Sequence, residues 1–166
     1  MIPIPYGRGA LAWKWPYEGL LTSRLDSLKS EKTGLSLVET ALENPIGSPT
    51  LPTLAAGKKT CTILISDHTR PVPSRDILPP VLRQLRQGNP DIQVTLLVAT
   101  GFHRLTTTAE LEAKLGSEIA RRERIVVHNA FDPDSNVNIG TLPSGAPLVI
   151  DRVAVETELL IAEGFI

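Results

Sequence analysis

The amino-acid sequence predicts an α/β protein, with a Rossmann-like three-layer fold around a mainly parallel sheet. From residue 60 onward, strand patterns alternate with helical patterns, an order typical of a parallel sheet with helices on both faces. The run "IQVTLLVAT" at residues 92–100 has no polar face for most of its length, which fits a strand covered on both sides. No Gly-x-Gly-x-x-Gly stretch or Walker lysine motif occurs, so a standard dinucleotide or P-loop site is not indicated.

Residues 1–35 form an N-terminal segment for which the sequence predicts little regular structure. Three prolines and several glycines oppose helices, although short apolar pieces fit edge strands. All the tryptophans and tyrosines of the chain lie in this segment: Tyr6, Trp13, Trp15 and Tyr17. We expect these rings to dock the segment on the domain or on another surface, and we assign residues 36–166 to the α/β domain.

The domain begins with helical patterns and then alternates. Apolar spacing predicts helices at residues 36–42, 51–57 and 76–87, and strands at Thr60–Ser66 and residues 92–100. Pro79 and Pro80 indicate that the third helix begins late or bends near its start. A capping box at Thr107 and Glu110 starts a helix that Gly116 ends. The remaining elements are strands at residues 124–128 and Leu159–Ala162, and a hairpin of residues 138–140 and 146–150.

The composition is that of an ordinary soluble globular protein, with 42% apolar and 21% charged residues among 166. The formal net charge is −1 without a long basic run, so neither nucleic acid nor a membrane is an expected partner. Cys61 is the single cysteine and lies in an apolar run, which excludes an internal disulfide and favours a small buried side chain. With no signal-peptide pattern and no run of transmembrane length, we expect a cytoplasmic protein.

Polar side chains gather where two of the predicted strands end. "SDHTR" ends the strand at Thr60–Ser66, and "TGFHR" ends the strand at residues 92–100. Ligands bind at the carboxyl ends of strands in open α/β sheets, so the two clusters share a crevice if the strands are neighbours. Arg70, in a proline-stiffened loop, suits two-point capture of a carboxylate or phosphate. His103 follows a glycine that permits close approach of a ligand, and its imidazole titrates near neutral pH, as a proton carrier must.

Each of these residues also has a structural interpretation. Asp67 could equally cap the turn after its strand through backbone amides. Arg70 could be a solvated surface arginine. For His68 and His128 a structural hydrogen bond is favoured over a catalytic role.

The sequence predicts no metal site within the chain. It holds three histidines and one cysteine, without the His-x-x-x-His or Cys-x-x-Cys spacing of zinc sites. The acidic pair Asp132 and Asp134 could bind a hard cation weakly, but a polar turn is the favoured account.

Six short motifs follow one another along residues 37–166: "ALENPIGS", "SDHTRPVPS", "ATGFHR", "TAEL", "IGTLPSG" and "EGFI". Together they resemble the N-terminal portion of the nickel-pincer-dependent lactate racemases and related 2-hydroxyacid racemases and epimerases. The first 34 residues carry little of this resemblance. It implies an isomerase in which a nicotinate-derived, nickel-containing pincer nucleotide takes up the α-hydrogen as hydride while a histidine takes the hydroxyl proton.

The resemblance also implies roles for single residues. His103 would be one of two acid/base histidines, and Arg70 would bind the carboxylate of a small 2-hydroxy acid such as lactate. Asp67 would hold Arg70, the cofactor or the substrate in the same pocket, and Thr69 would contact the cofactor. Racemisation needs proton handling on two faces of the substrate, hence two bases with pKa values near the working pH.

Three parts of the family's site have no counterpart in the sequence. The second catalytic histidine, the tethering lysine and the nickel ligand lie beyond the match to "EGFI", and here no lysine follows Lys114 and no histidine follows His128. We therefore expect the remainder of the same polypeptide to supply them and the isolated chain to be inactive. The alternative is a stand-alone module that binds a small anionic ligand, a carboxylate or nucleotide phosphate, without catalysis; a third hypothesis is a fragment that only folds or oligomerises.

Overall fold

The computed structural model describes residues 1–16, 19 and 30–164, and the chain divides into two compact units, Met1–Glu31 and Lys32–Ile166. The two units are described separately below. In the first, strands β1 (Ile2–Tyr6) and β2 (Gly9–Trp13) pair antiparallel as a hairpin. The short strands expected in this segment therefore form, although in a two-stranded sheet of their own.

The aromatic residues of the first unit lie largely on this hairpin. The rings of Trp13 and Trp15 meet edge to face, with 4.9 Å between their centroids. Tyr17 lies outside the described residues. Docking of the segment through its aromatic rings stays a prediction.

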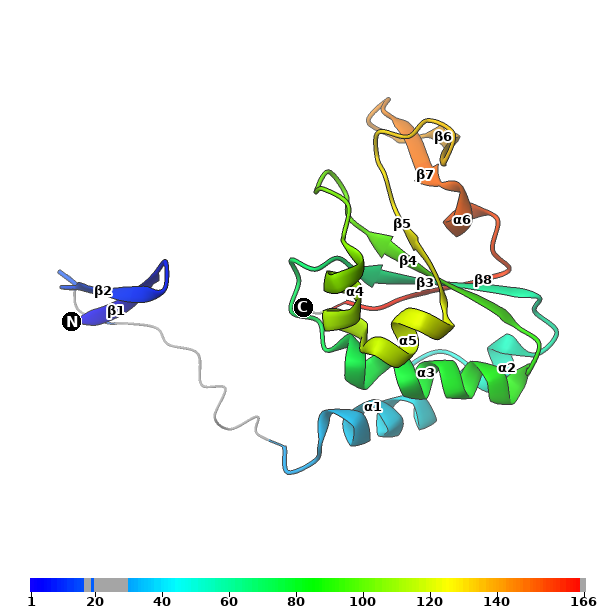
Figure 1. Cartoon of the computed structure of the whole chain (residues 1–166), viewed down its shortest axis with the longest axis horizontal. Helices are drawn as coiled ribbons and strands as arrows, with labels where there is room; N and C mark the ends of the chain where they lie inside the picture. Colours follow the sequence, from blue (N-terminus) through cyan, green and yellow to red (C-terminus); the bar gives the residue numbers. More distant parts are fainter. Residues whose placement is uncertain (17–18, 20–29, 165–166) are drawn as a thin grey trace. The chain divides into compact units, whose positions relative to one another are not determined.

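A parallel sheet of four strands organises the second unit (Figure 1). Its order is β5-β4-β3-β8, with bounds Arg124–Val127, Gln93–Ala99, Thr60–Ser66 and Leu159–Ala162. β3 and β4 pair in register from Thr60 opposite Gln93 to Ser66 opposite Ala99. The predicted α/β class and parallel sheet are confirmed, and the two strands that end in polar clusters are neighbours.

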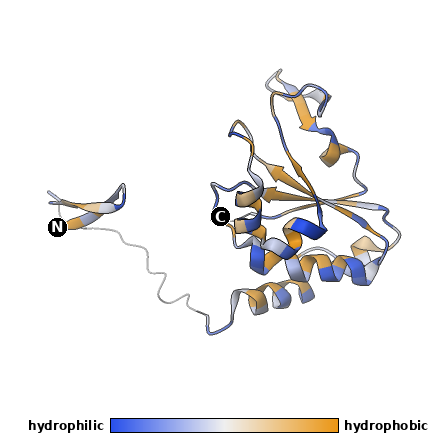
Figure 2. Cartoon of the chain, in the orientation of Figure 1, coloured by the Kyte–Doolittle hydropathy of each residue, from blue (hydrophilic) through white to orange (hydrophobic). Residues whose placement is uncertain are grey.

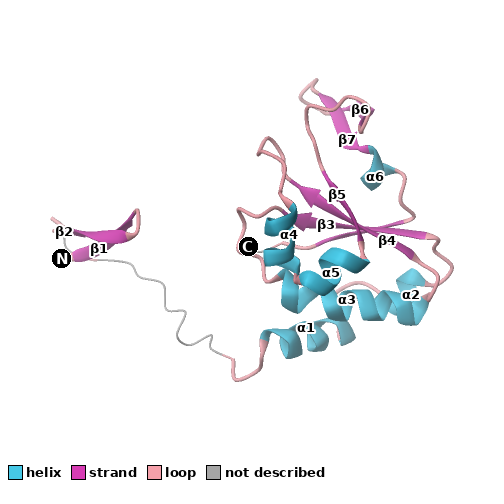
Figure 3. Cartoon of the chain, in the orientation of Figure 1, coloured by secondary structure: helices cyan, strands magenta, loops and turns pink. Residues whose placement is uncertain are grey.

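Helices pack against this sheet, and a hairpin extends beyond it (Figure 3). The helices are α1 (Gly34–Glu43), α2 (Leu51–Ala55), α3 (Ser74–Gly88), α4 (Thr108–Leu115), α5 (Ser117–Arg122) and α6 (Arg152–Val155). The predicted hairpin forms as β6 (Asn136–Thr141) and β7 (Pro147–Asp151). Within the described part of the chain, no helix is both long and apolar enough to cross a membrane.

The core lies between β3, β4 and helix α3, and Figure 2 shows apolar residues gathered on the strands and on the inner sides of the helices. Side chains alternate along β3, so Cys61, Ile63 and Ile65 share one face with the core. Thr62 points to the opposite face, where its hydroxyl donates to the Val153 carbonyl of α6 at 3.1 Å. Burial raises the pKa of the Cys61 thiol to about 11, in keeping with its predicted role as a small packed side chain.

Helix α3 begins at Ser74, so the prediction of a late start is wrong. Pro79 and Pro80 lie inside the helix, where each removes one backbone N–H donor. In a helix interior each proline costs about 3 kcal/mol, because its ring also clashes with the carbonyl four residues earlier. The helix also buries four large apolar side chains: Leu78, Val81, Leu82 and Leu85. Each is worth about 1.5–3 kcal/mol, so their burial offsets the cost of the two prolines.

Helix α4 starts as its capping box predicts. The Thr107 hydroxyl accepts from the Glu110 amide at 3.4 Å, and the Glu110 carboxylate accepts from the Thr107 amide at 2.9 Å. Gly116 ends the helix with a φ of +85°, a conformation that favours glycine. This helix borders the carboxyl ends of β3 and β4, where the candidate site lies (Figure 1).

Candidate active site

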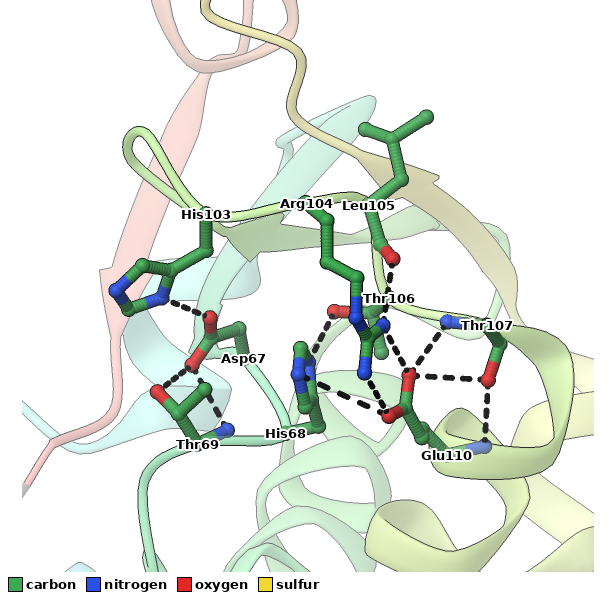
Figure 4. A network of polar contacts seen from close by, with 9 residues as sticks. All are labelled: Asp67, His68, Thr69, His103, Arg104, Leu105, Thr106, Thr107 and Glu110. Carbon is green, nitrogen blue, oxygen red and sulfur yellow. Dashed lines mark hydrogen bonds and ion pairs between the residues drawn. The ribbon is translucent and has the colours of Figure 1, made fainter.

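The two polar loops that follow β3 and β4 meet at the carboxyl edge of the sheet (Figure 4). After β4 the chain turns through Gly101, at a φ of +56°, and the His103 amide donates to the Thr100 carbonyl at 3.0 Å. This tight turn brings the His103 ring over the first residue after β3. The His103 Nδ1 lies 2.6 Å from the Asp67 Oδ2. The two polar clusters are thus joined by a histidine–aspartate pair, and the crevice that they were predicted to share stays a prediction.

Asp67 is an almost fully buried carboxylate whose two oxygens both accept hydrogen bonds. Its side chain is 2% exposed, and its Oδ1 accepts from the Thr69 amide at 3.0 Å and the Thr69 hydroxyl at 2.6 Å. Burial alone raises the pKa of Asp67, but the bonds from Thr69 and His103 outweigh it and hold the pKa at about 2. This pKa lies below the ordinary 3.8, so the ionised Asp67 contributes its full stability to the fold above that pH and loses it as the pH falls toward about 2.

The ionised state of Asp67 fixes the proton on His103. A carboxylate only accepts, so the Nδ1 of His103 must donate, which leaves the Nε2 of the neutral ring as the acceptor. The His103 side chain is 47% exposed, and within the described residues its Nε2 has no partner. A half-exposed, oriented imidazole with a free Nε2 is the arrangement that a general base requires.

Arg70 lies in the same loop, three residues after Asp67. It is exposed, and none of the described carboxylates pairs with its guanidinium. Together with His68 it lines an open pocket of about 610 Å³ between the loop and α4, with Glu110 and Lys114 on the opposite wall. A cavity of this size is in the range of small-molecule sites. The unpaired guanidinium is free to bind a carboxylate or phosphate that enters it.

Asp67 and Thr69 form hydrogen bonds with each other. The partners expected from the family resemblance are Arg70, the cofactor or the substrate for Asp67, and the cofactor for Thr69. Both donors of Thr69 point at one Asp67 oxygen, so the turn cap considered for Asp67 is present alongside the bond to His103. Arg70 is not a side-chain partner of Asp67 in the described structure. The predicted contacts of Asp67 with substrate and of Thr69 with cofactor stay predictions.

The rim of the pocket is an ion-pair network that sequence reasoning missed. Arg104 donates two bonds to the Glu110 carboxylate, at 2.9 and 2.6 Å, and these bonds lower the pKa of Glu110. His68 lies between Thr106, at 3.2 Å from its Nδ1, and Glu110, at 3.7 Å from its Nε2. Through the hydrogen bond of its Nδ1 to Thr106 and its position beside Glu110, His68 links the first loop to the start of α4. Arg104 and Glu110 lie six residues apart, outside the helical spacings at which ion pairs are sought.

His128, at the end of β5, makes a second histidine–aspartate pair. Its Nδ1 lies 3.0 Å from the Asp151 Oδ2, and the other oxygen of Asp151 accepts from the Val153 amide at the start of α6. Its carbonyl also accepts from the Thr100 hydroxyl at 2.6 Å. The histidine ties the β7–α6 corner to the sheet, which agrees with the structural role favoured for it.

The described residues do not by themselves fit a nickel ion. Among them, no three His, Cys, Asp or Glu side chains gather closely enough to hold a metal. Asp132 accepts from the Asp134 amide at 3.0 Å, the polar turn favoured from the sequence.

Comparison with known proteins gives long matches to one family. The family model described as the lactate racemase N-terminal domain matches residues 6–166. A lactate racemase of Thermoanaerobacterium thermosaccharolyticum is 48% identical, over 99% of this chain and 39% of that protein. A lactate racemase of Lactiplantibacillus plantarum is 49% identical, over 99% of this chain and 40% of that protein. The chain thus spans about two fifths of the length of these relatives.

Solved structures agree with this assignment. The lactate racemase apoprotein from Thermoanaerobacterium thermosaccharolyticum matches with a TM-score of 0.88 at 46% identity, over 99% of this chain and 38% of that one. A protein from Thermotoga maritima matches with a TM-score of 0.57 at 19% identity, over 78% of this chain and 32% of that one, and shows the fold alone. The resemblance carried by the six motifs is confirmed: the chain belongs to the lactate racemase N-terminal domain family.

Proposed function

We propose that this chain is the part of a lactate racemase that binds the substrate carboxylate and carries one of its two acid/base histidines. The observation that supports this most is the oriented His103 ring, whose Nε2 is free among the described residues and whose Nδ1 is held by the ionised Asp67. The unpaired Arg70 lies in the same loop as Asp67. Relatives named lactate racemase make lactate the first substrate to test.

Arg70, His103 and Asp67 each have a defined task in this proposal. Arg70 binds the carboxylate with two parallel N–H bonds, which fixes the reacting carbon and leaves its hydroxyl free. The Nε2 of His103 accepts the hydroxyl proton of one enantiomer as the 2-hydroxy acid becomes a 2-oxo acid, and in the reverse direction it donates a proton to the oxygen as that enantiomer is re-formed. Asp67 stabilises the imidazolium that exists between these two events.

The remaining parts of the reaction lie outside the described residues. Uptake and return of hydride is the chemistry that the family resemblance gives to a nickel-pincer nucleotide. Its tether, its metal ligand and the histidine on the other face of the substrate would come from the remainder of the polypeptide.

The direct test of this function is a comparison of two proteins. The full-length protein, loaded with its cofactor, is expected to interconvert the lactate enantiomers, as followed by chiral chromatography. The 166-residue chain alone, given the same cofactor, is expected to show no racemisation above background, because it carries one base of two. Binding of lactate by titration calorimetry without turnover by the full-length protein would instead favour the anion-binding module.

Arg70→Lys in the full-length protein is expected to raise the KM for lactate about 10- to 100-fold. An ammonium cannot make the planar two-point contact of a guanidinium, and charge-assisted bonds of this kind are worth about 1.5–3 kcal/mol. Steady-state kinetics measures the effect. Arg83→Lys on the exposed side of α3, where the arginine pairs with Glu39, is the matched control. An unchanged KM for the Arg70 variant would remove this residue from the substrate site.

A further inference from the structure

The Arg70 loop, which we define as residues 67–74, has few backbone bonds of its own. It contains neither helix nor strand before Ser74, and its two prolines, Pro71 and Pro73, supply no N–H donors. Its internal bonds run from the Arg70 amide to the Asp67 carbonyl at 3.3 Å and from the Ser74 amide to the Val72 carbonyl at 2.8 Å. Side chains from other elements must therefore hold the loop in place.

Lys114, from the last turn of α4, reaches the middle of this loop. Its Nζ donates to the Arg70 carbonyl at 3.1 Å, and it lines the same pocket as Arg70. Burial lowers the pKa of Lys114, while the charges of Glu163 and Asp67 raise it in part. A partly desolvated ammonium that donates to a backbone carbonyl holds that part of the loop through a charge-assisted hydrogen bond.

Glu163, the first residue after β8, reaches the end of the loop. Its Oε1 accepts from the Ser74 hydroxyl at 2.6 Å. Ser74 is 1% exposed, and the Glu163 amide itself donates to the Leu64 carbonyl of β3 at 2.9 Å. Glu163 therefore ties the start of α3, where the loop ends, to strand β3.

These contacts hold the loop at three positions. Asp67 is held by Thr69 and His103, the Arg70 backbone by Lys114, and Ser74 by Glu163. We propose that Lys114 and Glu163 are positioning residues that hold the Arg70 loop where its guanidinium can bind the substrate carboxylate. This inference rests on the proposed function, and neither residue needs to touch the substrate.

The test uses Lys114→Met in the full-length protein, since methionine keeps the length of the side chain and removes the donor. Hydrogen exchange of the apoprotein is expected to be faster across residues 67–76, with exchange in the sheet unchanged. The KM for lactate is expected to rise about three- to tenfold, the effect of one lost hydrogen bond, with kcat within about twofold of the parent. Lys114→Arg, which restores a donor, is expected to recover most of the KM.

Lys59→Met is the matched control, because Lys59 is exposed and directly precedes the amino end of β3, at the other end of the strand from the Arg70 loop. Glu163→Leu is expected to reproduce the Lys114→Met effects, and Glu163→Gln, which still accepts from Ser74, to leave them small. An unchanged KM in Lys114→Met overturns the proposal, and so does faster exchange throughout the protein. If the parent protein fails to racemise lactate, the proposed function fails, while exchange in the Arg70 loop still tests whether Lys114 holds it.

Discussion

His103→Ala in the full-length protein is expected to lower kcat for lactate racemisation about 10²- to 10⁴-fold in both directions. In the proposed function the Nε2 of His103 takes up the hydroxyl proton in one direction and returns it in the other, so its loss would remove both steps. Chiral chromatography of reactions started from each enantiomer measures the two rates. Because the ring is 47% exposed, added imidazole has room to enter and restore part of the rate.

The control for His103→Ala is His128→Asn. His128 also pairs with a buried aspartate, Asp151, but it joins the β7–α6 corner to the sheet and makes no contact with the Arg70 loop among the described residues. Its loss is expected to lower the melting temperature and to leave kcat of the folded protein near that of the parent. Turnover by His103→Ala at the parent rate would leave His103 as a structural residue.

Asp67→Asn is expected to lower kcat by about 10²- to 10⁴-fold without unfolding the protein. Two donors of Thr69 point at the Oδ1 of Asp67, so the amide oxygen of asparagine will occupy that position. The NH₂ group then faces the His103 Nδ1, which must accept, and the ring proton moves to Nε2. A protonated Nε2 cannot take a proton from the substrate, the same tautomer effect that disables a protease triad.

The tautomer exchange can be observed directly. Nitrogen NMR of the protein labelled at histidine is expected to show His103 protonated at Nδ1 in the parent and at Nε2 in Asp67→Asn. Asp151→Asn, in the other histidine–aspartate pair, is the control and is expected to leave the His103 signals unchanged. A folded Asp67→Asn variant with parental kcat would show that Asp67 does not act through His103.

The sheet and the polar clusters at its carboxyl edge could be predicted from the sequence, because apolar runs and turn residues are patterns of neighbouring residues. The run at Thr60–Ser66 is confirmed to the residue as β3, and the run at residues 92–100 as β4 within one residue of its ends. The capping box at Thr107 fixed the start of α4. Helices α5 and α6, with six and four residues, are too short for an apolar period to show.

The partners within the site could not be predicted in the same way, because they depend on register and turns. Asp67 meets His103 only since β3 and β4 are in register at their ends and Gly101 turns the chain back. A glycine directly after the second strand was the available signal for that turn. Lys114 and Glu163 looked like an ordinary helix-end lysine and strand-end acid, and only the packing of α4 and β8 brings them to the Arg70 loop.

Glu110 limits where this site can change in evolution. One carboxylate caps α4, pairs with Arg104 and lies beside His68, so its replacement removes three contacts at once. A relative whose pocket binds a different small molecule is therefore expected to keep this residue and to vary its neighbours. Ala113 lines the same pocket without a polar side chain to lose, and larger or smaller residues there would reshape the cavity at little cost to α4.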